Sequence, residues 1–299
     1  MTNHVETAEA QRPPDCRRRR KEAKDWQTRL LSPPYVGAYR PPRSNTGFTV
    51  VELLVVAAVL AFLCLVMASG LSRVRPNTNA AVCQRNLRTL TSAWTMYAEE
   101  NGDILPAPGL ANPGRPPWIA SNLEDVLATI TSGALFPYVK NRAVYQCPAN
   151  PAKMLYHGVT QPIPRSYSMS DVFGMGFWLS APTWRTYARK GEIVLPARTF
   201  LFIDEHPDSI NDGEFANVCT GAQPGDPPGS ARIIDFPANY HDGGCGLSYA
   251  DGHGELHVWV GARIKNAPLI SSSPIQLNVP AQSSWMDMQW LAARTTVRQ

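Results

Sequence analysis

The apolar residues of this chain form two patterns, one continuous and one periodic. The continuous pattern is an apolar run from Phe48 to Leu71, in which Glu52 is the only charged residue. At a rise of about 1.5 Å per residue, roughly 20 residues cross the hydrocarbon core of a bilayer. The run is therefore long enough for one transmembrane helix, and a lone carboxylate within it needs a partner.

The periodic pattern follows directly. Beyond Pro76, apolar residues recur at spacings that define one face of an amphipathic helix. These residues are Cys83, Leu87, Leu90, Trp94 and Tyr97. Gly102 and Pro106 then supply stop signals. We expect a transmembrane and assembly helix over residues 48–71 and its amphipathic continuation over residues 72–104.

Residues 105–299 predict a β-rich head with long Pro-rich loops. Residues 197–203 combine β-branched and aromatic side chains, which favours a strand. Asp251 and Gly252 lie between two alternating runs, and Asp-Gly in that position is a strong hairpin signal. We therefore expect a C-terminal hairpin at about 246–260.

Charge is concentrated before the apolar run. Residues 1–47 hold ten Lys and Arg against five Asp and Glu, a net charge of +5, whereas the whole chain carries +4. A basic segment before a membrane helix is typical of the cytoplasmic side. We interpret residues 1–47 as a basic, Pro-rich leader peptide. The remainder carries no positive excess, so the sequence does not indicate nucleic-acid binding.

The cysteines divide in the same way. Cys16 lies in the leader and Cys64 in the apolar run, which leaves an even number beyond them. These four are Cys83, Cys147, Cys219 and Cys245. They allow three pairings, which sequence alone does not separate. We favour Cys83–Cys147 with Cys219–Cys245, since the first pair would tie the helix to the Pro-rich region that follows it.

The start of the apolar run resembles a known processing site. Gly47, Phe48 and Glu52, followed by the apolar residues, look like the junction of type IV prepilins and type II secretion pseudopilins. The resemblance implies cleavage after Gly47 by a prepilin peptidase and N-methylation of Phe48. It also implies that Glu52 acts in assembly, by neutralising the Phe48 amine of a neighbouring subunit.

A second motif resembles one large group of prepilin-like proteins. His241 stands ten positions before Asp251, which Gly252 follows, and this spelling is the H-X9-DG motif for which the group is named. The resemblance implies an α+β, pilin-like fold. In that fold a long N-terminal helix, with a membrane half and an amphipathic half, packs on a small antiparallel β-sheet.

Acidic residues suggest a cation site in the head. Asp204, Glu205, Asp208 and Asp212 follow the strand expected at 197–203. Oxygen ligands on flexible loops suit Ca²⁺. The same residue types also favour tight turns, so both interpretations stay open. We expect His241 to form structural hydrogen bonds that link its loop to the hairpin.

The sequence favours a filament subunit over an enzyme. Ser248 lacks the Gly-x-Ser-x-Gly elbow of a serine hydrolase. We expect a pilin or pseudopilin, held in the inner membrane by a single pass, whose partners are a prepilin peptidase and other pilin subunits. The leader would be cytoplasmic and the head extracytoplasmic. The alternative is a membrane-anchored binding protein for a carbohydrate or cation, with Trp118, Trp178 or Trp184 stacking on sugar rings.

Overall fold

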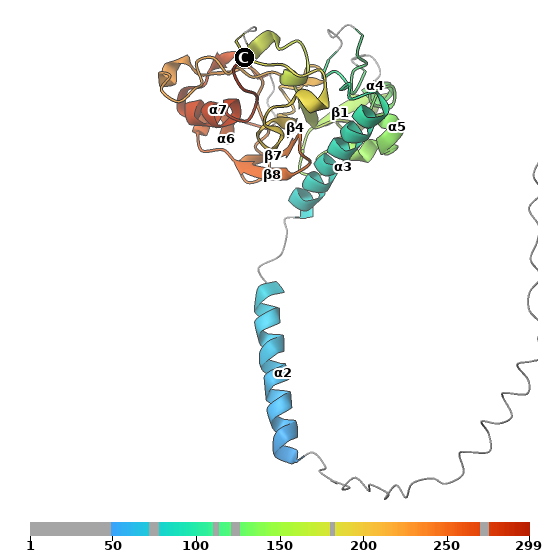
Figure 1. The fold of residues 1–299 in the computed structure, drawn as a ribbon, viewed down its shortest axis with the longest axis vertical. Coiled ribbons are helices and arrows are strands. Elements are labelled where there is room, and N and C mark those ends of the chain that lie inside the picture. Colours follow the sequence, from blue (N-terminus) through green and yellow to red (C-terminus); the bar gives the residue numbers. More distant parts are fainter. Residues whose placement is uncertain (1–48, 72–77, 110–113, 121–125, 180–182, 270–274) are drawn as a thin grey trace, which may run out of the picture. The chain divides into compact units, whose positions relative to one another are not determined.

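The computed structural model describes residues 49–71, 78–109, 114–120, 126–179, 183–269 and 275–299, drawn as the coloured ribbon in Figure 1. The chain divides into two compact units, Met1–Ala68 and Ser69–Gln299. The helices are α2 (Val50–Leu71), α3 (Thr78–Glu100), α4 (Val126–Thr131), α5 (Phe136–Val139), α6 (Ala262–Lys265) and α7 (Trp285–Ala292). The strands are β1 (Lys153–Tyr156), β2 (Val159–Pro162), β3 (Tyr167–Ser170), β4 (Phe200–Asp204), β5 (Glu214–Phe215), β6 (Arg232–Ile233), β7 (Gly244–Tyr249), β8 (Gly254–Val258) and β9 (Val279–Pro280). The described residues of the second unit also form seven 3₁₀-helices, of which η1 (Arg142–Tyr145) lies close to the candidate site.

Helix α2 begins with a capping box. The Thr49 hydroxyl accepts a hydrogen bond from the Glu52 backbone N–H (3.2 Å). In return, the Glu52 carboxylate accepts from the Thr49 backbone N–H (2.8 Å) and from its hydroxyl (3.0 Å). Two N–H groups that have no partner inside the helix are thereby satisfied, as in the Ser/Thr-x-x-Glu motif.

The core of the second unit is a five-stranded sheet in the order β5-β3-β4-β7-β8. The pairs β3–β4, β4–β7 and β7–β8 are antiparallel. The β3–β5 pair is parallel, because the chain turns back after β4 and returns along the far edge of β3. The sheet is therefore mixed.

Helix α3 packs on one face of this sheet, against β7, β8 and β4 (Figure 1). Along β7 the residues that face α3 are small, which brings the helix close. A Cβ added to Gly246 would lie 2.7 Å from Cys83 Sγ and 2.8 Å from Leu87 Cδ1. Two positions on, the Ser248 hydroxyl is 2.9 Å from that of Thr91. Since side chains alternate along a strand, the residues between these point to the opposite face.

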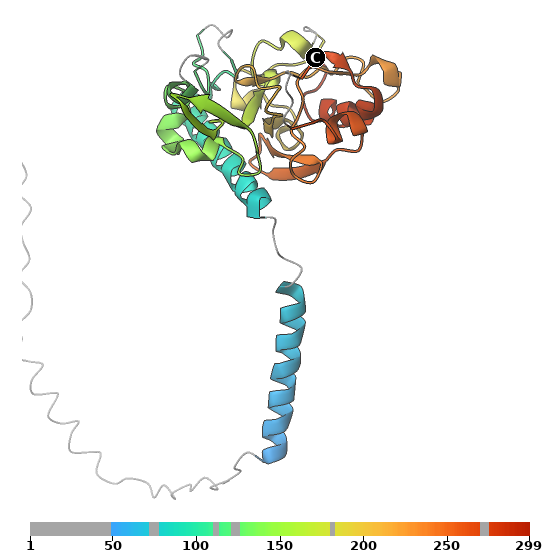
Figure 2. The same cartoon turned by 180° about the vertical axis from the view of Figure 1, so that it is seen from behind.

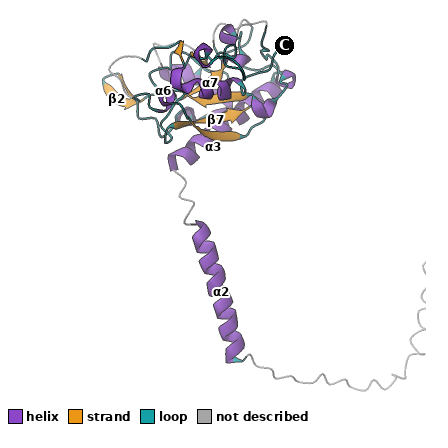
Figure 3. Ribbon diagram, turned by 90° about the vertical axis from the view of Figure 1, so that its left-hand side faces the viewer, coloured by secondary structure: helices purple, strands orange, loops and turns teal. Residues whose placement is uncertain are grey.

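Side chains from the C-terminal part of the chain cover that opposite face of the sheet. His257, on β8, stacks on Trp290 of α7 with ring centroids 3.5 Å apart. Trp259 packs edge-on against the same indole at 6.0 Å. Figure 3 shows β7 between α7 and α3. Strand β7 is consequently buried along its whole length.

Two small antiparallel sheets complete the second unit. Strands β1 and β2 form a hairpin, yellow-green in Figure 2, and β6 pairs with β9. The tight turn between β1 and β2 contains Gly158, whose φ of +78° suits a residue without a Cβ. Neither of these sheets is joined to the five-stranded sheet by strand pairing.

The pilin-like fold predicted from sequence is wrong in three respects. The central sheet is mixed and not antiparallel, since β5 pairs parallel to β3. The segment expected to form one long helix instead contains two described helices, α2 of 22 residues and α3 of 23 residues. Across the ranges that the structure describes, no helix combines the length and the apolar character needed to cross a membrane. β5 spans only two residues, which is too short for a sequence pattern to indicate its pairing.

Candidate functional site

Four buried side chains converge at the junction of α3 and the sheet, and we call them the cysteine–histidine cluster. Its members are Cys83, Cys147, Asp204 and His241. Their four ligand atoms lie within 4.8 Å of one another. None of the four residues is more than 6% exposed. Among the described residues, no other group of three or more Cys, His, Asp or Glu converges in this way.

Three distances define the cluster. The Cys83 thiol donates to Asp204 Oδ2 at 3.1 Å. Nε2 of His241 lies 3.1 Å from the Cys147 sulfur and 3.3 Å from the same Asp204 oxygen. The carboxylate therefore stands between one thiol and the imidazole, and the second thiol contacts the same ring nitrogen.

Each member is held by the local structure of its element. Cys83 lies on the face of α3 that packs over Gly246. Asp204 ends β4 and faces α3, because it is two positions from Phe202, whose partner on β7 is Ser248.

The other two members lie on short turns. Cys147 follows η1, and its backbone N–H donates to the Ser166 hydroxyl (3.0 Å). One residue earlier, the Gln146 carbonyl accepts from the Asn86 side chain of α3 (2.8 Å). His241 opens a tight turn closed by reciprocal backbone hydrogen bonds with Gly244, both 3.1 Å. Gly243, inside that turn, has a φ of +83°.

A tyrosine hydroxyl binds the carboxylate. Tyr240 donates to Asp204 Oδ1 at 2.6 Å, so both carboxylate oxygens are hydrogen-bonded. Burial and the charge of Asp204 raise the pKa of this tyrosine. Its hydroxyl therefore keeps its proton and remains a donor to the carboxylate.

The two thiols of the cluster differ in acidity. A hydrogen bond with the Cys147 sulfur, burial and the Asp204 charge all raise the pKa of Cys83. Burial also acts to raise the pKa of Cys147, but hydrogen bonds from Cys83 and His241 outweigh it and lower that pKa. Burial lowers the pKa of His241, yet its contacts with Asp204 and Cys147 raise it to about 10.

The geometry differs from that of a nucleophilic triad. In a catalytic Cys–His–acid arrangement, the nucleophile and the acid contact opposite ring nitrogens. Here the sulfur of Cys147 and the carboxylate of Asp204 both face Nε2 of His241. Nδ1 of that ring has no hydrogen-bond partner within the described part of the chain. Four ligand atoms around a common point are the arrangement of a metal site.

The residues of the processing motif are only partly described. Gly47 and Phe48 lie outside the described residues, and the Glu52 carboxylate caps the start of α2. Within the H-X9-DG motif, His241 belongs to the cluster and Asp251 lies in the β7–β8 turn. There the Asp251 carboxylate accepts from the backbone N–H of His253 (3.1 Å). Gly252, with a φ of +100°, completes the turn.

All four cysteines beyond α2 are free thiols. The favoured disulfides Cys83–Cys147 and Cys219–Cys245 are therefore absent from the structure. Cys83 and Cys147 lie together in the cluster, whereas Cys219 lies 3.8 Å from the Ala292 carbonyl. Cys245 lies on β7 with the sheet between it and α3.

The carboxylates predicted to bind Ca²⁺ are distributed over different surroundings. Asp204 belongs to the cluster, and Glu205, next along the chain, accepts from the Ser209 hydroxyl at 2.8 Å. The Asp208 backbone N–H donates to His206 Nδ1 (3.2 Å). Among the described residues, Glu205, Asp208 and Asp212 therefore do not converge with Asp204 on one site.

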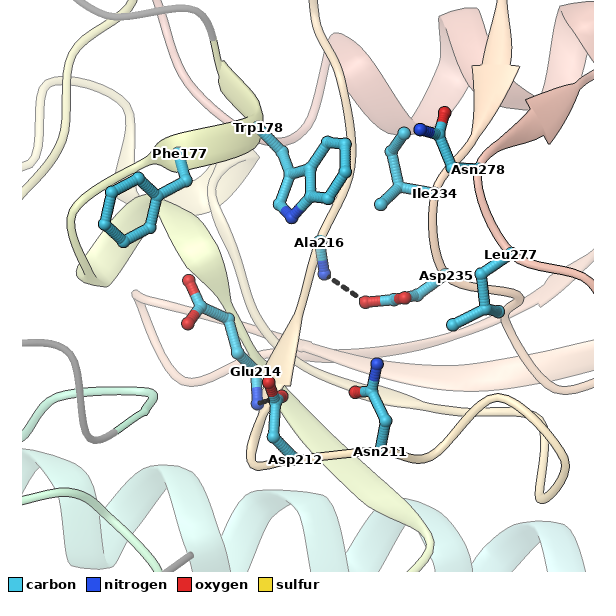
Figure 4. Close-up of a pocket in the computed structure, with 10 residues that line it drawn as sticks. All are labelled: Phe177, Trp178, Asn211, Asp212, Glu214, Ala216, Ile234, Asp235, Leu277 and Asn278. Carbon is cyan, nitrogen blue, oxygen red and sulfur yellow. Dashed lines mark hydrogen bonds between the residues drawn. The ribbon is translucent and has the colours of Figure 1, made fainter.

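Asp212 lines a separate pocket, shown in Figure 4. Trp178 overhangs this pocket, and Glu214 and Asp235 contribute further carboxylates. Asp235 accepts a hydrogen bond from the Ala216 backbone N–H (2.6 Å). Burial, with the neighbouring carboxylates, raises the pKa of Glu214 to about 7 and that of Asp235 to about 7. Of the tryptophans proposed for sugar stacking, Trp178 is partly exposed, and Trp118 and Trp184 are buried.

The sequence predicts a different role for each part of the cluster. It places Cys83 and Cys147 in a disulfide, Asp204 in a Ca²⁺ site, and His241 in a family motif with structural hydrogen bonds. The ligand spacing contains no Cys-x-x-Cys pair, which is the signal that identifies many zinc sites. Comparison of the chain with family models, with curated proteins and with solved structures found no match.

Proposed function

We propose that the chain is a subunit of a filament of the type IV pilus or type II secretion class. A prepilin peptidase cleaves it after Gly47 and methylates Phe48, and α2 then packs against α2 of neighbouring copies. Under this proposal residues 1–47 are a cytoplasmic leader and the second unit is an extracytoplasmic head. The subunit is held at the inner membrane until it is assembled.

The observation that carries the proposal is the exposure of α2. Val50 is 74% exposed and Phe62 is 66% exposed, and the large apolar residues between them are exposed on every side of the helix. A helix that is apolar all round must be buried against other apolar groups. Copies of the same helix, packed side by side, supply such groups.

Glu52 has a second use under this proposal. Within one chain its carboxylate accepts from the backbone and the hydroxyl of Thr49. After cleavage, the new amine of Phe48 adjoins Thr49, one turn from that carboxylate. Between packed helices the carboxylate of one copy can then neutralise the amine of the next, because burial makes an unpaired charge costly.

The intact mass of the protein recovered from sheared surface fibres tests this proposal. We expect a chain that begins at Phe48 and carries one added methyl group, recovered as fibres. A chain that begins elsewhere, or one that never enters fibres, contradicts the proposal. The Gly47→Ala variant serves as the matched control and should accumulate uncleaved, because the added Cβ obstructs close approach of a peptidase backbone.

The pocket in Figure 4 favours a second candidate function, the binding of a carbohydrate. An aromatic ring beside carboxylate and amide side chains suits the apolar face and the hydroxyl groups of a sugar. Titration of the purified chain with soluble oligosaccharides should then change its tryptophan fluorescence, and Trp178→Ala should abolish the change. Trp184→Ala provides the control, since that indole is buried.

A further inference from the structure

We propose that Cys83, Cys147, Asp204 and His241 bind one Zn²⁺ ion. The distances between their ligand atoms carry the inference. Zinc bonds of about 2.0–2.3 Å place the ligand atoms of a tetrahedral site about 3.3–3.8 Å apart. The three recorded separations in the cluster are 3.1, 3.1 and 3.3 Å, and every other pair lies within 4.8 Å. Outward movements of a few tenths of an ångström admit the ion.

The ligand types select the metal. Two cysteine sulfurs and an imidazole are soft or borderline donors that suit Zn²⁺, whereas Ca²⁺ takes six to eight oxygen ligands. Asp204 supplies the only carboxylate of the cluster. Four protein ligands fill a tetrahedral shell, which is typical of structural zinc, because catalytic zinc keeps a position open for water.

The protein holds these ligands in place without the ion. Gly246 lets α3 approach until Cys83 meets the carboxylate, and Asn86 ties α3 to the carbonyl beside Cys147. The hydroxyl of Tyr240 fixes the second oxygen of Asp204. Hydrogen bonds of this kind orient metal ligands and are typical of metal sites.

Zinc binding would exchange protons for the ion. Both thiols must be deprotonated and the imidazole must be neutral to bind zinc, so the protons that these three groups carry leave when Zn²⁺ enters. Two thiolates, one carboxylate and a neutral imidazole carry three negative charges, and the divalent ion reduces this to one. The one ion pair recorded for Asp204 within the described ranges is with His241, a ligand of the same cluster. Buried charges of one sign are stable only when paired or bound to a metal.

The ion would join four parts of the head. It would connect α3, the residue pair after η1, the end of β4 and the turn before β7. This inference does not depend on the proposed filament function, because all four ligands lie in the second unit. Its chemical competitor is a Cys83–Cys147 disulfide, which removes two ligands and requires a two-electron oxidant.

Metal analysis of the full chain, purified with a thiol reductant and without chelator, tests the proposal. We expect one zinc per chain by elemental mass spectrometry. Replacement of zinc by Co²⁺ should produce the visible bands of a tetrahedral site and near-ultraviolet thiolate-to-cobalt charge transfer. Absence of bound zinc under reducing conditions, or cobalt spectra without the thiolate bands, overturns the proposal. So does a chain that carries a Cys83–Cys147 disulfide after reduction and zinc addition.

Variants identify the ligands. Cys83→Ser and Cys147→Ser should each lower zinc affinity more than tenfold, measured by competition with a chromophoric chelator. Cys219→Ser is the matched control, since that thiol is equally buried and lies outside the cluster, and it should bind zinc like the parent. His241→Cys keeps a ligand at the position. It should retain cobalt with stronger thiolate bands, a result that loss of folding cannot produce. Unchanged affinity in either serine variant overturns the assignment.

Discussion

Helices α2 and α3 are nearly equal in length, at 22 and 23 residues, yet they present their apolar side chains to opposite surroundings. In α2 the large apolar residues from Val50 to Leu63 are exposed, whereas in α3 Leu87 and Trp94 are fully buried against the sheet. The periodic helix finds its partner within the chain. The continuously apolar helix has no such periodicity, and the proposed function assigns it copies of itself as partners.

The two helices also belong to regions with different ionisable groups. The single carboxylate of α2 is exposed and serves as a helix cap. The head instead buries the carboxylates of Glu205 and Asp235 and partly buries that of Glu214. Stability of the head should therefore depend on pH and on packing, whereas α2 should affect assembly.

Glu52→Ala should lower filament yield at least tenfold and leave the head unchanged. Removing one member of a buried ion pair costs about 3–5 kcal/mol, which exceeds the 1.4 kcal/mol of a tenfold change. Thr49→Ala is the matched control, because it removes the hydroxyl of the capping box and keeps the carboxylate. Filament yield and the amount of processed subunit would be measured for both. Equal losses in the two variants would mean that Glu52 acts only as a cap.

Leu87→Ala should destabilise the head by about 2–5 kcal/mol, the usual range for a cavity left in a packed core. Leu54→Ala, an equal truncation on α2, should change the free energy of unfolding by less than about 0.5 kcal/mol, since that side chain is exposed. Denaturant unfolding followed by tryptophan fluorescence provides both values. Similar losses would show that α2 packs against the head.

Gly246→Ala should cost about 1–3 kcal/mol through overpacking, because its methyl group would meet Cys83 and Leu87. It should also lower zinc affinity by displacing the thiol from the cluster. Gly229→Ala offers a control, since nothing lies within 4 Å of a Cβ added there. Thermal unfolding and metal competition would be measured on both variants. A neutral Gly246→Ala would show that α3 can move away from β7 without loss.

Stability of the head should fall as pH rises through the range from about 4 to 7. Glu214 and Asp235 have pKa values raised to about 7 in the folded chain, above their ordinary values. The folded state therefore binds protons more tightly than the unfolded state and loses that advantage as the pH rises. We expect a loss of the order of 1–3 kcal/mol between pH 5 and pH 8. The double variant Glu214→Gln, Asp235→Asn should flatten the profile, whereas Glu192→Gln, on the surface, should not.

Local sequence patterns predict the positions of helices and turns better than they predict how these elements pack together. The periodic residues from Cys83 to Tyr97 all lie within α3, and Asp251 with Gly252 occupies the turn between β7 and β8. The strand expected at 197–203 overlaps β4, displaced by three residues at its start. Each of these depends on neighbours in sequence, which periodicity and turn chemistry report directly.

The pairings between distant residues were not predictable in this way. The parallel β3–β5 pair depends on where the chain returns after β4. Strand β5 has only two residues, which is too short for its sequence to indicate its partner strand. The cysteine–histidine cluster joins residues whose types were noticed but whose proximity depends on the whole sheet. Glu52 was interpreted through a family resemblance, although the local Thr49–Glu52 spacing also matches a capping box.

The cluster also imposes an order on folding. Cys83 and Asp204 are 121 positions apart, and Cys147 and His241 are 94 apart. Contacts of such separation form late, since the intervening chain must first be ordered. During synthesis both thiols leave the ribosome before the histidine is made. The nascent chain therefore passes through an interval in which its two sulfurs are available to any oxidant, and the speed with which β4 and β7 pair sets how long that interval lasts.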